Sequence, residues 1–197
     1  YQELLKDSVG EAQNFTVATN WTGNVIGGLK AARKDTVTME VNGEKVEMTR
    51  SEIRQKQREE QKSLNLVWLN EMVNSTGQLR EKIAFFWHGH FACRNLNVFY
   101  QQGLLDVIRR NALGNFGNLL KEVSKSAAML NFLNNQQNRK DHPNENFARE
   151  VMELFTLGRG NYTEHDIKEA ARSFTGWGSN LQGEFLFRRF QHDFGSK

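Results

Sequence analysis

The segment from Asn144 to Trp177 constrains the fold of this chain more than any other. Its first half carries apolar residues at helical spacing, namely Phe147, Val151, Leu154 and Phe155. Gly158 then occupies the place of a left-handed residue that ends a helix. Thr163 and Asp166 have the spacing of a capping box that opens a second helix, which is closed by Gly176. The segment therefore predicts two short helices joined by a tight connection and packed on one core.

Glu150 interrupts this apolar pattern, because a helical wheel places it beside Leu154 at the margin of the apolar face. A carboxylate in that position needs a partner or takes a raised pKa. One interpretation is a buried salt bridge to an arginine such as Arg172. The other is a metal ligand or general base, and both stay open. Arg149 and Glu153, four residues apart, predict a surface ion pair.

A second unusual stretch is FFWHGHF at positions 85–91, which follows a capping-box pattern at Ser75–Gln78. No charged side chain occurs from position 83 to 93, so the pattern predicts a helix buried on nearly all sides. Two imidazoles in such a helix are hydrogen-bonded or bound to a metal. Residues two apart point about 160° apart on a regular helix, so His88 and His90 share one ion only if the turn is loosened.

These polar residues define a candidate catalytic and metal site. It would gather His88 or His90 with Glu150, and His165 or Asp166 as a further ligand. A divalent metal is the possible cofactor, because imidazole nitrogen and carboxylate oxygen are ligands that zinc takes. The sequence contains no H-E-x-x-H pattern. The competing interpretation is that both helix histidines are core residues bonded to backbone or carboxylate groups.

The clearest β pattern is TVTMEV-NG-EKVEMT, from Thr36 to Thr49. Asn42-Gly43 suits a two-residue type I′ turn. The resulting register places Glu40 opposite Lys45. Most of the remaining chain is patterned as helices, so we expect a mainly α, multi-helix domain over residues 1–197 with this hairpin at its periphery. Other expected elements are a long helix opened by a Thr49/Glu52 capping box, helices at Leu96–Ala112 and Phe116–Leu133, and a short strand near 185–190.

Composition excludes several classes of protein. The net charge is only +3, and the densest charge run, Arg50 to Lys62, alternates in sign like a solvated helix face rather than a phosphate-binding stripe. No nucleic-acid motif accompanies it, so we expect no nucleic-acid partner. No apolar run approaches the roughly 20 residues needed to span a bilayer. The single cysteine, Cys93, reads as a buried, inert thiol.

Three runs carry a resemblance to a known family: QLREKIAFFWHGHFACR at 78–94, the segment Asn144–Trp177, and HDFGSK at 192–197. In order and spacing they resemble the bacterial domain-of-unknown-function family 1800, DUF1800. The resemblance implies a largely helical fold, a bacterial source and, in many members, export from the cytoplasm to the periplasm, cell surface or medium. Family members are longer than this chain, so we expect it to be a fragment. The resemblance assigns no catalytic residue.

Two functional hypotheses follow. The first is a non-catalytic helical module of a secreted or cell-envelope protein, which binds other protein subunits or organises an assembly. The second is an extracytoplasmic metal-dependent hydrolase with a His/Glu site. Metal content and the surroundings of Glu150 and both histidines distinguish them.

Overall fold

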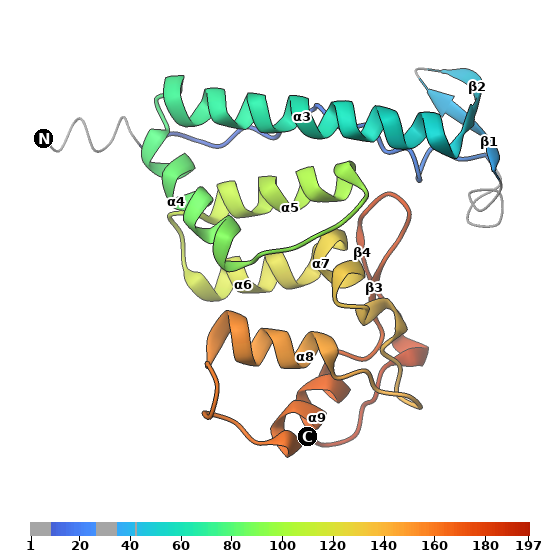
Figure 1. Ribbon diagram of the computed structural model, residues 1–197. Coiled ribbons are helices and arrows are strands. Elements are labelled where there is room, and N and C mark those ends of the chain that lie inside the picture. The colour runs from blue at the N-terminus through green and yellow to red at the C-terminus, as the bar shows by residue number, and fades with distance from the viewer. Residues whose placement is uncertain (1–8, 27–34, 42) are drawn as a thin grey trace, which may run out of the picture.

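The computed structural model describes residues 9–26, 35–41 and 43–197. It confirms a mainly α fold, with helices stacked in layers from α3 at one end to α9 at the other (Figure 1). No helix in the described ranges is long and apolar enough to cross a membrane. The α-helices are α3 (Arg50–Asn74), α4 (Gln78–His90), α5 (Val98–Asn111), α6 (Phe116–Lys125), α7 (Ala127–Phe132), α8 (Asn146–Glu150) and α9 (Glu164–Ser173).

The peripheral hairpin is formed by β1 (Thr36–Val41) and β2 (Glu44–Thr49). Its antiparallel register pairs Glu40 with Lys45, as the sequence predicts. Gly43 has a φ of +84°, which suits the expected tight turn, whereas Asn42 lies outside the described residues. Val37 and Met39 of β1 pack with Trp21 and Val25 of the preceding segment in a small apolar cluster that is distinct from the main core.

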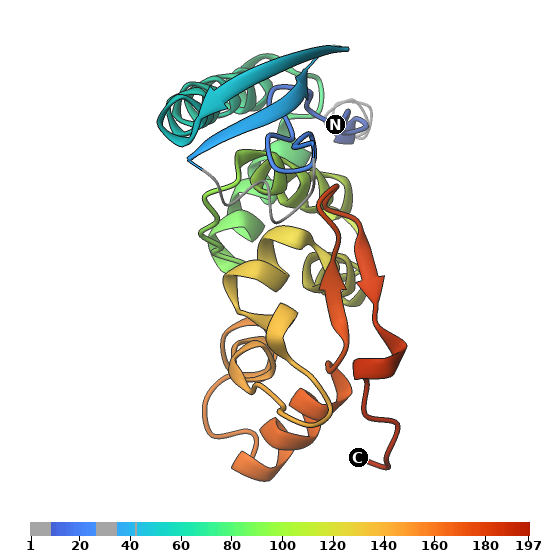
Figure 2. The same ribbon diagram turned by 90° about the vertical axis from the view of Figure 1, so that its right-hand side faces the viewer.

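A second antiparallel sheet joins β3 (Trp177–Ser179) to β4 (Phe185–Phe187). The strand expected near 185–190 is therefore present, while β3 was not expected. Figure 2 shows this hairpin running along one side of the helical stack toward α5. At its tip the carbonyl of Leu181 accepts hydrogen bonds from Asn20 Nδ2 and from the Tyr100 hydroxyl, each at 3.0 Å. The tip thus ties the start of the described chain to α5.

The helix ends follow local side-chain chemistry in most places. The Thr49/Glu52 and Thr163/Asp166 capping boxes are both present. The capping box at Ser75–Gln78 was a wrong prediction: Gly77 is the N-cap of α4, and Gln78 Nε2 turns back to the carbonyl of Val73 at 2.8 Å. Glycine has no side chain that could bond the first turn, so α4 begins without a side-chain cap.

The helix expected at 116–133 is divided in two by Ser126. The backbone of Ser126 is extended, with a ψ of 140°, and this ends α6. The Ser126 hydroxyl then accepts a hydrogen bond from Met129 N at the start of α7. Between α7 and α8 lies a short 3-10 helix, η1 (Asn135–Gln137), and a further one, η3 (Arg189–Gln191), follows β4. A serine cap inside a helical pattern therefore outweighs the apolar periodicity around it.

The helix expected before Gly158 exists, but only its first half is an α-helix. After α8 the chain continues as a π-helix, η2 (Val151–Thr156), in which Leu157 N donates to the carbonyl of Met152 at 2.8 Å. Gly158 follows with a φ of +76°, as expected of a helix-ending residue. The wider π turn changes the direction of every side chain after position 150, so a regular helical wheel fails there.

Candidate binding groove

His88 projects from α4 toward α3 and is half-buried. Its ring meets the edge of the Trp68 indole at a centroid distance of 5.2 Å. Burial lowers the pKa of His88, so the ring is neutral at pH 7. Among the described residues no hydrogen-bond partner of this imidazole is found. Its surroundings are those of an aromatic core residue.

His90 joins α4 to η2. Its Nε2 lies 3.1 Å from the carbonyl oxygen of Phe155, and because a carbonyl only accepts, Nε2 is the donor. Phe91 packs on Phe155 with ring centroids 5.3 Å apart, so the end of α4 contacts η2. Burial of α4 on nearly all sides was a wrong prediction: α4 packs on α3 and α5, but Phe85 and Phe86 are 61% and 60% exposed.

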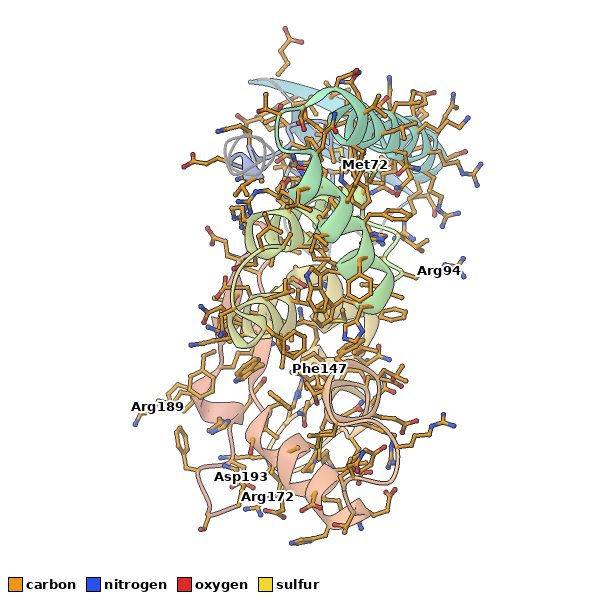
Figure 3. All side chains as sticks on the ribbon, turned by 90° about the vertical axis from the view of Figure 1, so that its left-hand side faces the viewer. Met72, Arg94, Phe147, Arg172, Arg189 and Asp193 are labelled. Carbon is orange, nitrogen blue, oxygen red and sulfur yellow. The ribbon has the colours of Figure 1, made fainter. Side chains whose placement is uncertain are left out.

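Glu150 does not form the salt bridge to Arg172 that the sequence allowed. Arg172 is bonded instead to Asp193, at 2.7 Å, and to Glu169 (Figure 3). Glu150 is half-buried at the junction of α8 and η2, and within the described part of the chain its carboxylate forms no hydrogen bond or ion pair. Its charge acts on Arg159, whose pKa is raised first by a hydrogen bond to Glu153 and to a smaller extent by Glu150.

The ion pair expected between Arg149 and Glu153 is also absent, because the two residues lie on either side of the change from α to π helix. Arg149 bonds Glu164 at 2.8 Å and Glu145 at 3.1 Å. Glu153 accepts from Tyr162 and Arg159 instead.

The four candidate metal ligands are not brought together. His165 is exposed in the first turn of α9, and His90 is bonded to a backbone carbonyl. In residues 9–26, 35–41 and 43–197 no group of three or more His, Cys, Asp or Glu side chains could hold a metal ion. Burial raises the pKa of the Cys93 thiol to about 12, so it is a poor ligand and nucleophile.

A large concave surface lies elsewhere, around Leu96 in the connection between α4 and α5. Leu96 is 82% exposed and borders three adjoining pockets of about 280, 610 and 860 Å³. We call the three together the Leu96 groove. Of the described residues that line it, none is Asp or Glu, whereas six are basic: Arg50, Arg54, Arg58, Lys62, Arg139 and Arg188.

One wall of the groove is a basic stripe on α3, formed by Arg54, Arg58 and Lys62 at four-residue spacing. This spacing places them on one helix face. The acidic residues of the same run are engaged elsewhere: Glu60 accepts from Trp21 Nε1 at 3.0 Å, and Glu59 accepts from Gln55 Nε2 at 3.2 Å. Three basic residues of this run therefore line the groove, and its acidic residues do not. The four-residue spacing of Arg54, Arg58 and Lys62 is the sequence pattern that could have revealed this stripe.

The largest of the three pockets is a polar hollow between the α4–α5 connection, η1 and the β3–β4 hairpin. We call it the amide recess, because amide side chains dominate its lining: Asn95, Asn97, Asn131, Gln136, Asn180, Gln182 and Gln191. Its two cations, Arg139 and Arg188, form no ion pair with any described residue. The same holds for Arg54, Arg58 and Lys62, so five basic side chains of the groove lack a carboxylate partner in the described chain.

A family model described as "Protein of unknown function (DUF1800)" matches residues 3–197. The chain belongs to the DUF1800 family. No curated protein and no solved structure matches it. The match includes both helix histidines, Glu150 and the Leu96 groove, so all of them lie within the DUF1800 region.

No sequence pattern indicated the most buried charges among the described residues of this DUF1800 chain. Glu81 of α4 and Arg109 of α5 are 2% and 1% exposed and form a two-pronged ion pair, with Arg109 Nε 2.8 Å from Glu81 Oε2 and Nη2 2.9 Å from Oε1. Trp68 Nε1 donates to the same carboxylate at 2.9 Å. Asp106 lies beside Arg109, and burial raises the pKa of Asp106. This network fastens α3, α4 and α5 together, and it is structural.

Proposed function

We propose that this chain is a partner-binding module of a secreted or cell-envelope protein, and that it binds another protein subunit through the α3 side of the Leu96 groove. The observation that carries the proposal is the exposed Leu96 beside the basic stripe of Arg54, Arg58 and Lys62, none of which has a carboxylate partner in the described structure. An apolar centre with a charged rim is the usual anatomy of a protein interface. Uncompensated positive charge favours an acidic partner, because it speeds and orients the encounter.

The partner chemistry that fits is an acidic segment with apolar residues among the carboxylates. The carboxylates would bond the guanidinium and ammonium groups of the stripe, while an apolar side chain would cover Leu96. Such a complex weakens as salt rises, because both charge sets are exposed before binding.

The test uses a fluorescent peptide of alternating glutamate and leucine as the probe, with binding measured by anisotropy. The double variant Arg54→Glu/Arg58→Glu should weaken binding by at least about tenfold, a loss of about 1.4 kcal/mol. Lys56→Glu/Lys121→Glu is the matched control, because it changes the net charge equally at exposed sites outside the groove. Equal weakening by both double variants, or no binding by the native protein, would contradict the proposal.

The location outside the cytoplasm is a separate part of the proposal, and it rests on family membership. Fractionation of the producing bacterium with an antibody to this chain tests it, with a cytoplasmic enzyme as the marker of leakage. The metal-dependent hydrolase is the less supported alternative, because His88, His90, Glu150 and His165 are not gathered around a common point in the described chain. Stoichiometric metal in the purified protein would restore it.

A further inference from the structure

We infer that the amide recess, the part of the Leu96 groove formed by η1 and the β3–β4 hairpin, is a binding site in its own right, and that its ligand is a small carbohydrate bearing a carboxylate. The inference goes beyond the proposed function, because it depends on the β3–β4 hairpin and η1 rather than on the basic stripe of α3. It rests on a positioned guanidinium, a second cation, unused amide groups and the size of the recess.

Arg188 supplies the positioned guanidinium. Its Nη1 donates to Gln136 Oε1 at 3.1 Å and its Nη2 donates to the carbonyl of Ser179 at 3.2 Å. Gly178 makes this placement possible, since a Cβ at that position would lie 1.9 Å from Nη1. The remaining N–H groups of Arg188 have no acceptor among the described residues. The group is thus held in place before a ligand arrives, which lowers the entropy lost on binding.

Arg139 is the second cation of the recess, and it is exposed. Two guanidinium groups that line one hollow repel each other unless an anion lies between them or near both. A planar carboxylate is the natural complement of a guanidinium, because paired N–H groups match its two oxygens. Since no lining residue in the described chain is acidic, the carboxylate has to come from the ligand.

The amides indicate what else the ligand carries. Gln182 and Gln191 make no side-chain hydrogen bond within the described chain, and Asn131 uses only its Nδ2, which donates to the carbonyl of Ala127 at 2.7 Å. Amides both donate and accept, as sugar hydroxyls do, so these groups match a polyhydroxylated ligand. The volume of about 860 Å³ falls within the range of small-molecule sites. An inorganic anion alone would leave the amides and most of the space unused.

Calorimetric titration of the purified protein with trigalacturonate tests the inference. Its methyl ester is the matched neutral probe, and acetate and inorganic phosphate are the simple anions. We expect the trimer to bind and the ester to bind at least about tenfold more weakly, a loss typical of a charged hydrogen-bonded pair. No binding of the trimer would overturn the inference. Equal affinity for acetate or phosphate would also overturn it, because the recess would then be a simple anion site.

Variants locate the binding. Arg188→Gln and Arg139→Gln should each weaken trimer binding by about tenfold, and the second keeps the test valid if the first disturbs the hairpin, because Arg139 is exposed. Arg189→Gln is the matched control: it is the next residue, it does not line the recess, and it projects away from the molecule in Figure 3. Equal weakening by Arg189→Gln would overturn the inference.

A double variant of the basic stripe distinguishes the two binding sites. Arg54→Glu/Arg58→Glu should change trimer affinity less than Arg188→Gln does, whether or not the acidic peptide binds the stripe. A larger effect of the stripe variant would place the trimer outside the recess and overturn the inference.

Discussion

His90 Nε2 lies 3.1 Å from the carbonyl oxygen of Phe155, and this bond joins α4 to the last turn of the π-helix η2. The final carbonyls of a helix have no partner within it, so they need donors from elsewhere. His90 supplies one such donor, and the rings of Phe91 and Phe155 pack beside this hydrogen bond. The imidazole therefore acts as a helix cap at long range.

His90→Ala should lower the free energy of unfolding by about 1–3 kcal/mol, because it leaves the Phe155 carbonyl without its donor and removes aromatic contacts. His165→Ala, at an exposed position, should change it by less than about 0.5 kcal/mol. Urea unfolding followed by tryptophan fluorescence measures both. Equal stability of the two variants would contradict a capping role for His90.

Glu81→Gln should lower the free energy of unfolding by about 3–5 kcal/mol or prevent folding, because it leaves the buried Arg109 charge uncompensated. Glu145→Gln is the control, since its pairing with Arg149 is half-exposed and such pairs contribute about 1 kcal/mol or less. Circular dichroism during thermal unfolding compares them. A similar melting temperature for both variants would show that the Glu81–Arg109 pair does not hold α3, α4 and α5 together.

His88 should make stability depend on pH. Burial lowers its pKa in the folded state, so the unfolded chain, with a histidine pKa of about 6.5, binds the proton more readily. The stability from neutral His88 is therefore fully present above about pH 6.5 and is lost as the pH falls through the lower folded pKa. His88→Gln should flatten the decline in unfolding free energy over this window, measured by urea titrations at several pH values. Parallel curves for the two proteins would exclude this role.

Cys93 should resist alkylation while the protein is folded. Burial raises its thiol pKa to about 12, so almost no thiolate exists at pH 8. Iodoacetamide followed by intact-mass measurement should show an unmodified protein in buffer and one added group in denaturing urea. Rapid labelling in buffer would mean that the α4–α5 connection opens readily.

Gly176→Ala and Gly103→Ala should have opposite effects. Gly176 has a φ of +78°, and a Cβ there would lie 2.6 Å from the carbonyl oxygen of Arg188, so the change should cost about 1–3 kcal/mol. Gly103 lies inside α5 with nothing within 4 Å of an added Cβ, so alanine there should stabilise by about 0.5–1 kcal/mol. Thermal unfolding of the two variants gives the signs.

Features set by neighbouring residues could be read from the sequence. The β1–β2 register and the capping boxes at Thr49 and Thr163 depend on side chains within a few positions, and they are present. The π-helix could not be foreseen, because its wider turn depends on packing and not on a local residue pattern. For that reason the helical-wheel placements of Glu150 and Glu153 were unreliable.

Contacts between residues far apart in the sequence could not be predicted either. Glu81 and Arg109 are 28 positions apart and look like ordinary surface charges in sequence, yet they form the most buried ion pair of the described chain. The Leu96 groove likewise draws its lining from α3, η1 and the β3–β4 hairpin. Periodicity shows which face of one helix is polar, but not which faces of several elements meet.

The bond between Asn20 and the Leu181 carbonyl spans 161 positions, and it has a consequence for folding during synthesis. The ribosome releases Asn20 long before Leu181 exists. Until the β3–β4 hairpin emerges, the first described segment is attached only through its contacts with the helices, such as the bond from Trp21 Nε1 to Glu60 of α3 and the bond from Val17 N to Gln102 of α5. A pause or premature stop before position 181 would release a chain whose helices can assemble while its first described segment stays incompletely secured. Synthesis of the β3–β4 hairpin, rather than collapse of the helical core, is then the event that secures this segment.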